Sequence, residues 1–203
     1  CQRQKDDRKR WAKKGSSFRF DPMRADRVCR FIANLTHVKG PLSGQRIVLE
    51  PWQVFILTTV FGWVNQEGHR RFRRVYIEVP RGNAKSTLSS GVGLYVLCAD
   101  GEGGAECYSL ATTRQQARIV FGDAQAMARA NPGLRAKFGL GMAAHNLHVL
   151  QTASKFEPLS AEGSTLDGLN THLGIIDELH AHKTRAVYDV VETSIGKRAQ
   201  SML

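Results

Sequence analysis

Residues 79–87 have the types and the spacing of a loop that binds phosphate. Their sequence is Val79-Pro80-Arg81-Gly82-Asn83-Ala84-Lys85-Ser86-Thr87. They follow a strand-like run at 74–78 and precede a helix-like run at 88–97, which is the context that such a loop requires. Backbone N–H groups at a helix N-terminus lack intrahelical partners and can therefore hold phosphate oxygens. In this loop Lys85 would reach the β- and γ-phosphates, and the Ser86 hydroxyl would ligate Mg²⁺.

The loop departs from the usual pattern G-x-x-x-x-G-K-[ST], because Val79 and Ala84 occupy its two glycine positions. Taken alone, it is an incomplete match that needs support elsewhere in the chain. Arg81 lies inside the loop, between Pro80 and Gly82. It could form a structural salt bridge, but its place in the loop favours contact with the γ-phosphate.

Two adjacent acids later in the chain supply that support. The apolar run at 173–176 ends in Asp177 and Glu178. In P-loop ATPases a buried strand ends in an Asp that helps to hold Mg²⁺, and a Glu directly after it can polarise the attacking water. The alternative is a strand end followed by two acids that cap a helix. Because the acids follow the phosphate loop within one α/β pattern, the catalytic interpretation is favoured.

Other polar residues are weaker candidates. Gln53 lies one helix upstream of the loop, where its amide could pair with adenine; the alternative is an exposed glutamine at the start of a helix. His180 could relay the state of the nucleotide to the helix that follows. The pairs 145/148 and 180/182 lack the further ligands of a zinc site, so we expect no zinc. An arginine finger from a neighbouring subunit is plausible, with several possible carriers: Arg114, Arg118, Arg129, Arg135 and Lys155.

The order of the predicted elements indicates an α/β fold with a mostly parallel central sheet flanked by helices. Strands are expected at 74–78, 107–111 and 173–178, a hairpin at 145–159, and helices at 22–35, 51–64, 88–97, 114–130 and 184–196. Ligands of such sheets bind at the carboxyl ends of the strands, where both the loop and the acids fall. Residues 198–203 resemble the beginning of another strand. We therefore expect the sheet to be incomplete at the C-terminus, and a chain that begins at Cys1 to be part of a longer protein.

Composition limits the possible classes of protein. The chain has 203 residues, of which 42% are hydrophobic, enough for one sizeable soluble domain. Its longest apolar stretch, residues 54–64, is too short to span a bilayer. The four cysteines Cys1, Cys29, Cys98 and Cys107 are widely scattered, as expected for free thiols in a reducing cytoplasm.

Positive charge is concentrated in the N-terminal segment. The net charge is +11, and residues 1–30 hold eleven Lys and Arg against four Asp. A second cluster comprises Arg70, Arg71, Arg73 and Arg74. Both clusters could be solvated surface, or both could contact a polyanion such as DNA. Composition alone does not decide between these alternatives.

Three segments together resemble one protein family, the large terminase subunit of tailed bacteriophages and prophages. They are Leu49-Glu50-Pro51-Trp52-Gln53, the segment Pro80-Arg81-Gly82-Asn83-Ala84-Lys85-Ser86-Thr87, and Ile175-Ile176-Asp177-Glu178-Leu179-His180-Ala181-His182. Residues 111–117 and 165–169 look like further segments of the family. Loops of this family resemble Pro-Arg-Gly-x-Gly/Ala-Lys-Ser, so Ala84 is not exceptional there. The resemblance runs from about residue 43 to the C-terminus.

The resemblance implies an organisation and an activity. Residues 1–42 would be a basic arm and helix, and 43–203 a P-loop ATPase domain of the RecA/ASCE-like type, without the family's nuclease domain. By position, Gln53 would contact adenine, and Asp177 would hold Mg²⁺ while Glu178 acts as the catalytic glutamate. The phosphate and Mg²⁺ grip would fall on residues Arg81, Gly82, Asn83, Ala84, Lys85, Ser86 and Thr87.

The resemblance also implies partners. The protein would be an ATP-driven motor that moves double-stranded DNA into a procapsid, as a ring at the portal protein, together with the small terminase subunit, in the host bacterial cytoplasm. Two alternatives stay open: a helicase-like or other RecA-type nucleic-acid translocase, and a non-catalytic DNA-binding module that retains the fold. Intact Lys85, Ser86, Asp177 and Glu178 argue against the second.

Overall fold

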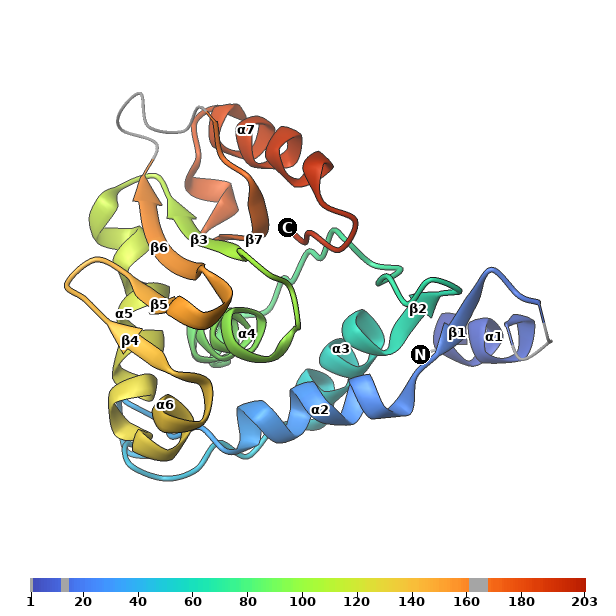
Figure 1. The fold of residues 1–203 in the computed structure, drawn as a ribbon, viewed down its shortest axis with the longest axis horizontal. Helices are drawn as coiled ribbons and strands as arrows, with labels where there is room; N and C mark the ends of the chain where they lie inside the picture. The colour runs from blue at the N-terminus through green and yellow to red at the C-terminus, as the bar shows by residue number, and fades with distance from the viewer. Residues whose placement is uncertain (1, 12–14, 161–167) are drawn as a thin grey trace.

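A five-stranded mixed sheet forms the centre of the protein. The computed structural model describes residues 2–11, 15–160 and 168–203 (Figure 1). The strand order is β4-β5-β6-β3-β7. The bounds are β3 Glu106–Ala111, β4 Leu140–Met142, β5 Leu147–Val149, β6 Ser154–Ser160 and β7 Thr171–Ile176. Strand β3 pairs in parallel with both β6 and β7, while β5 and β4 add an antiparallel edge. The predicted α/β class is confirmed.

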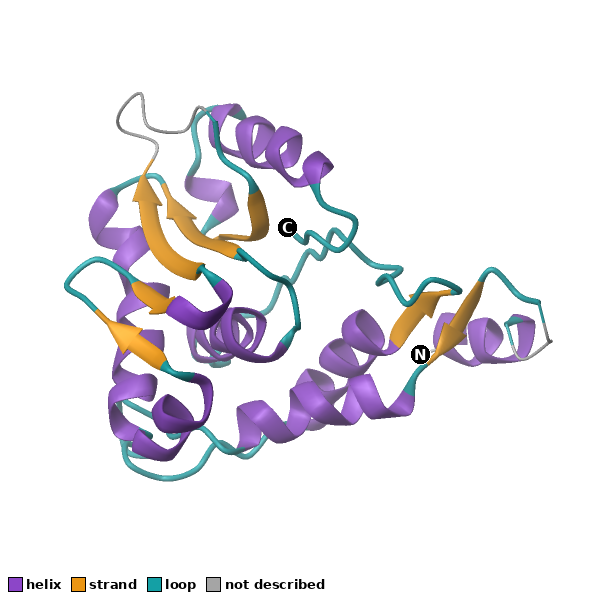
Figure 2. Ribbon diagram, in the orientation of Figure 1, coloured by secondary structure: helices purple, strands orange, loops and turns teal. Residues whose placement is uncertain are grey.

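Helices cover both faces of this sheet. Alternation along β3 sends Cys107 toward α4 (Lys85–Ala99) and α5 (Arg114–Ala130), and sends Tyr108 and Leu110 toward α7 (Ala186–Ser194). Helix α4 approaches β6 closely at Gly93, where an added Cβ would lie 2.6 Å from the Phe156 ring. The sheet is therefore the middle layer of three (Figure 2).

Two further helices extend the main core away from the sheet. Helix α2 (Pro22–Ala33) packs along α3 (Pro51–Gly62), and its Val28 and Ile32 are fully buried. Asp21 caps α2, because its carboxylate accepts hydrogen bonds from the backbone of Met23 and Arg24. Helix α6 (Pro132–Phe138) follows α5. Single 3-10 turns lie at Leu150–Thr152, Leu179–Ala181 and Ile195–Lys197.

A small N-terminal unit lies beyond α2 and α3. It contains α1 (Gln2–Arg10) and the antiparallel pair of β1 (Phe18–Phe20) and β2 (Trp63–Asn65). Figure 1 shows this unit at the far end of α2 and α3 from the five-stranded sheet. Because β2 follows α3 directly, α3 connects this unit to the main core.

Most of the predicted elements are confirmed. Helix 114–130 matches α5, and the side chain of Thr113 caps it by accepting from the Gln116 backbone N–H at 3.2 Å. The expected hairpin is formed by β5 and β6, and β7 ends one residue before Asp177. No helix in the described residues is long and apolar enough to cross a membrane. Cys29, Cys98 and Cys107 carry free thiols, whereas Cys1 lies outside the described residues.

The strand predicted at 74–78 is wrong. Residues 72–80 run as extended chain without a strand partner along most of their length. Among the described residues, only Leu203 forms backbone hydrogen bonds with them: the Val75 N–H donates to the Leu203 carbonyl at 2.8 Å, and the Leu203 N–H donates to the Arg73 carbonyl at 2.9 Å. Extended chain becomes a strand only when a neighbour completes the ladder, and here that neighbour is a single residue.

The C-terminal residues also pair with β7. Met202 forms a parallel bridge with Leu173, and its carbonyl accepts from the Gly174 N–H at 2.8 Å. Together with the bonds of Leu203, this bridge joins β7 to the extended segment 72–80. The two C-terminal residues thus lie in the position of a strand between them.

A buried charged cluster joins the same elements at their other end. Arg70 Nη2 donates to Asp100 Oδ2 at 2.5 Å, and His172 Nε2 lies 2.7 Å from the same oxygen. Arg70 also donates to the Gln200 carbonyl at 2.8 Å and lies over the Phe61 ring. Burial raises the pKa of Asp100, but Arg70 and His172 outweigh burial and hold that pKa below its ordinary value.

Replacing Asp100 with Asn should destabilise the fold. The substitution leaves the Arg70 guanidinium buried without a counter-charge, which costs about 3–5 kcal/mol. The control is Asp26→Asn, which removes an exposed partner of Arg30 and should cost less than about 1 kcal/mol. Urea denaturation measures both losses, and equal losses in the two variants would contradict the prediction.

The same pair predicts a dependence on pH. Because the folded-state pKa of Asp100 is lowered, its contribution to stability is present above the ordinary carboxyl pKa and is lost as the pH falls through the folded value. The wild type should therefore lose stability more steeply than Asp100→Asn on acidification below about pH 4. If the free energy of unfolding falls equally steeply with pH in both proteins, Asp100 does not contribute to the pH dependence of stability.

Candidate functional site

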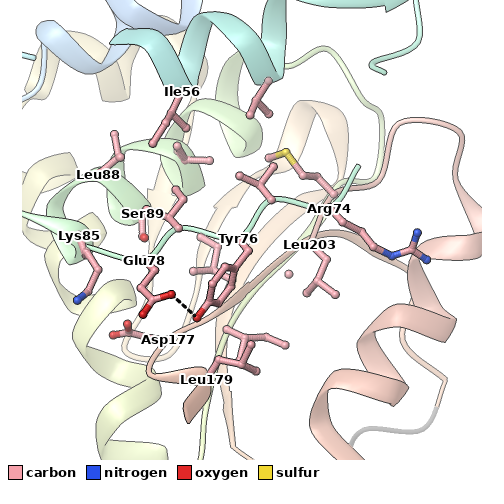
Figure 3. A pocket seen from close by; sticks show the side chains of 18 of the residues that line it. Ile56, Arg74, Tyr76, Glu78, Lys85, Leu88, Ser89, Asp177, Leu179 and Leu203 are labelled. Carbon is pink, nitrogen blue, oxygen red and sulfur yellow. Dashed lines mark hydrogen bonds between the residues drawn. The ribbon is translucent and has the colours of Figure 1, made fainter. Parts of the chain in front are cut away.

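A cavity of about 590 Å³ separates the extended segment 72–80 from β7. One wall is formed by residues 74–79 and the start of α4, the opposite wall by residues 173–180, and α3 contributes Trp52 and Ile56. Lys85, Glu78 and Asp177 lie toward one end of the cavity, and Arg74 and Leu203 toward the other (Figure 3). The phosphate-type loop and the acidic strand end therefore meet in one space.

Positive φ angles shape the phosphate-type loop. Gly82 has φ 85° and Ala84 has φ 54°, both left-handed. Ala84 thus adopts the conformation for which a glycine is normally chosen, at a cost of roughly 1–2 kcal/mol. It is the N-cap residue of α4, and its carbonyl accepts the first helical bond, from Leu88 at 3.0 Å. The N–H groups of residues 85–87 therefore lack intrahelical partners.

The two cations of the loop are available to a ligand. The Lys85 ammonium donates to the Val79 carbonyl at 3.0 Å, within its own loop. Arg81 lines the cavity and, within the described residues, makes no hydrogen bond or ion pair. A guanidinium and an ammonium beside open N–H groups form a site for a polyphosphate.

The acids occupy the opposite wall in distinct conformations. Asp177 continues from β7, where its N–H donates to the Leu110 carbonyl at 3.0 Å and its carboxylate accepts from the Glu178 N–H at 3.0 Å. Glu178 has φ 50° and ψ 49°, which is strained for a residue with a side chain. Such strain is concentrated at functional sites. The Glu178 carboxylate lies 3.4 Å from Nε2 of His180, which also lines the cavity.

Gln53 does not line this cavity. Its side-chain oxygen accepts from the Glu50 N–H at 2.9 Å and so caps the start of α3, where Gln53 is buried. Gly82, Asn83, Ser86 and Thr87 lie in the loop and the first turn of α4 but do not line the cavity. The structure thus brings together Arg81, Lys85, Asp177 and Glu178, while an adenine contact of Gln53 stays a prediction.

Sequence reasoning missed Glu78 and Tyr76. Glu78 reaches into the cavity between Lys85 and Asp177, and the Tyr76 hydroxyl donates to its carboxylate at 3.3 Å (Figure 3). Alternation along the segment before the loop could have indicated that both side chains share one face. Of the proposed arginine-finger carriers, Arg118 contacts His145 at 2.8 Å and Lys155 pairs with Glu157 at 2.9 Å.

The donor set suits Mg²⁺ held partly by phosphates. Within the described residues, no cluster of three or more His, Cys, Asp or Glu could bind a metal by itself. Mg²⁺ needs only one or two carboxylates when substrate phosphates and waters complete its octahedron. Asp177 faces the cavity from the wall opposite Lys85 and supplies such a carboxylate.

The comparison with protein families decides the identity of this domain. Residues 51–203, three quarters of the chain, match the family model described as "Terminase large subunit, ATPase domain". The chain belongs to the terminase large subunit family. The family expected from the three sequence segments is therefore confirmed. Of these family segments, residues 165–167 lie outside the described residues.

Terminase relatives agree in sequence and in structure. The large terminase subunit of Enterobacteria phage HK97 is 31% identical over 157 residues, which are 76% of this chain and 30% of the relative. The crystal structure of the HK97 large terminase superposes with a TM-score of 0.75 and 29% identity, covering 89% of this chain and 36% of that one. The chain thus spans about a third of the length of these terminases.

A second solved terminase shares the fold at lower identity. A mutant of the large terminase ATPase domain of Thermus phage P74-26 superposes with a TM-score of 0.53 and 21% identity, over 64% of this chain and 58% of that domain. Together these structures confirm the α/β fold of a terminase ATPase domain.

The left-handed conformation of Ala84 can be tested by a pair of substitutions. Ala84→Gly should keep the fold and the loop, because glycine adopts φ 54° without penalty. Ala84→Val should lower the free energy of unfolding by about 1–2 kcal/mol, since a branched side chain opposes this conformation. Nucleotide affinity should fall more in the valine variant, whose branched side chain opposes the loop conformation, than in the glycine variant, whose loop must be ordered on binding. Equal stabilities and affinities of the two variants, by urea denaturation and calorimetric titration, would contradict the conformation assigned to Ala84.

Proposed function

We propose that this chain is the ATP-hydrolysing motor domain of a phage large terminase and drives double-stranded DNA into the procapsid. The observation that carries the proposal is the cavity shared by Arg81 and Lys85 on one wall and Asp177 and Glu178 on the other. ATP hydrolysis needs cations at the phosphates and a carboxylate near the attacking water. Membership of the terminase family supports the coupling of this chemistry to DNA.

Each residue of the cavity has a role in the proposed reaction. The N–H groups at the start of α4 and the Lys85 ammonium would bind the β- and γ-phosphates. The Lys85 bond to the Val79 carbonyl must then be exchanged for a bond to phosphate. Arg81 would contact the γ-phosphate and offset the charge that develops on it.

Glu178 would take the proton from the attacking water. Its strained backbone conformation and the neighbouring His180 hold the carboxylate at the cavity wall. Asp177 and the Ser86 hydroxyl would hold Mg²⁺, which would neutralise phosphate charge and orient the phosphates when bound. One acid thus serves the metal and its neighbour serves the water.

The whole terminase would have further activities and partners. We infer that the full-length protein carries an endonuclease domain and assembles as a homo-oligomeric ring at the portal protein, with the small terminase subunit. This assembly would act in the host bacterial cytoplasm. The support is family membership, since the chain covers about a third of its relatives.

Glu178→Gln tests the proposed mechanism. Removing the general base should lower ATP turnover about 10²–10⁴-fold, while nucleotide binding stays near that of the wild type, because the amide keeps the size of the side chain. The control is Glu67→Gln, at an exposed acid paired with His69, which should leave both quantities unchanged. Phosphate release with and without DNA and portal protein, and titration with ATP, measure the two effects.

Two outcomes would contradict the proposed function. Wild-type protein without phosphate release under any of these conditions would refute an ATPase motor. Turnover in Glu178→Gln equal to that of the wild type would leave the motor possible but would refute the role assigned to Glu178.

A further inference from the structure

Helix α1 packs against the protein although it has no apolar residue. Its sequence, QRQKDDRKR, contains only polar and charged side chains. A helix that is polar on all sides cannot be held by hydrophobic burial. The attachment of α1 must therefore come from specific contacts of its polar and charged side chains, which include cation–π contacts of Arg3 with Phe72 and of Arg8 with Phe20.

One face of α1 is anchored by two polar contacts. The indole N–H of Trp63 donates to the side-chain oxygen of Gln4 at 3.0 Å, and Arg71 donates to the Asp7 carboxylate at 3.0 Å. Asp7 is the only buried residue of α1. Both contacts link the helix to residues at or after β2, so α1 has a defined position.

Arg71 is enclosed by aromatic side chains in this anchor. Its guanidinium lies 5.0–5.8 Å from the ring centroids of four aromatic residues, and its side chain is 15% exposed. These rings belong to Trp11, Phe18, Trp63 and Phe72. Desolvation by the aromatic rings strengthens both the cation–π contacts and the ion pair with Asp7.

The exposed surface of α1 carries unpaired positive charge. Lys5, Lys9 and Arg10 are exposed, and none of them has an ion pair or a hydrogen bond within the described residues. Lys5 and Lys9 are one helical turn apart, about 6 Å along the axis, a spacing at which like charges destabilise a helix. The acid beside them, Asp6, accepts a hydrogen bond from Gln2.

We propose that Lys5, Lys9 and Arg10, the basic face of α1, contact the phosphate backbone of double-stranded DNA. The choice of DNA as the polyanion rests on the proposed function. Cations on an anchored helix displace counterions from the duplex and need no base contact, so the binding is independent of sequence. Because α1 is already ordered, its docking on DNA costs less entropy than the ordering of a free arm.

A membrane surface fits this helix less well than DNA. Helices that lie on lipid bury an apolar face below the headgroups, and α1 has none. The location of α1 also separates this contact from catalysis. The helix lies at the far end of α2 and α3 from β7 (Figure 1), and no residue of α1 lines the ATP cavity.

The test compares two triple variants of the whole chain. Lys5→Gln, Lys9→Gln and Arg10→Gln remove three charges from the basic face of α1. The matched control, Arg27→Gln, Arg30→Gln and Lys137→Gln, removes three exposed charges from α2 and α6. Binding to a fluorescent duplex of mixed sequence is titrated at several salt concentrations, and circular dichroism verifies the fold of each variant.

The expected result is specific to α1. The α1 variant should bind DNA at least about tenfold more weakly at 100 mM salt, and its slope of log K against log salt should be less steep by about 2.7, for three lost phosphate contacts. In the control, the slope should change by less than about 0.9, which is the value for one phosphate contact. Nucleotide affinity should be unchanged in both variants, because the cavity is remote.

Three outcomes would overturn the proposal. The first is no loss of DNA binding in the α1 variant, and the second is an equal loss in both variants, which would indicate attraction by net charge alone. The third is an α1 variant that binds vesicles of phosphatidylserine and phosphatidylcholine more weakly than the wild type but binds DNA equally well. If the wild type binds DNA through α1 but never hydrolyses ATP, the proposed function fails while the DNA surface stands.

Discussion

The ion pair between Arg70 and Asp100 is the constraint on which the arrangement of this domain depends. A desolvated guanidinium needs a counter-charge close by. Asp100 at the end of α4 supplies it and also contacts His172 in β7, so Arg70 and these two elements are held together. Each of these elements leads to the cavity at its other end: Arg70 precedes the extended segment, α4 begins at Lys85, and β7 ends at Ile176, directly before Asp177. The buried charges thus set the distance between the two walls of a site that they do not touch.

Pairing at the cavity end is much sparser. Within the part of the chain that the structure describes, Leu203 alone pairs with the extended segment, while Met202 pairs with β7. The backbone from Tyr76 to Pro80 has no strand neighbour among the described residues, so this wall is held by its connections to Arg73 and to α4 rather than by a ladder. Strands with few hydrogen bonds open at low free energy. The wall with the phosphate loop is therefore the more compliant of the two.

Local patterns explain what could be predicted from the sequence. Helix α5 has a capping threonine and an apolar period, and β3 and β7 are short apolar runs, so their positions followed from neighbouring residues alone. The cluster of Arg70, Asp100 and His172 could not be predicted, because its members are 30 and 72 positions apart. The docking of α1 could not be predicted, because the helix has no apolar residue that would indicate a buried face. The segment 72–80 has the sequence pattern of a strand, and only the structure shows that it lacks a neighbouring strand. Lys85, Asp177 and Glu178 were found because spacing and chain order identify them without long-range contacts.

Ala84 in the left-handed region has a consequence for the thermodynamics of ligand binding. A glycine there would sample several backbone regions in the free protein, and a ligand would have to select one of them. Alanine reaches φ 54° in only a narrow well, so the loop has few competing conformations once the domain has folded. The free energy of folding offsets the strain at Ala84. Because the loop is ordered when the domain folds, nucleotide binding does not have to order it. The loop is therefore preorganised by the very residue that departs from the glycine pattern.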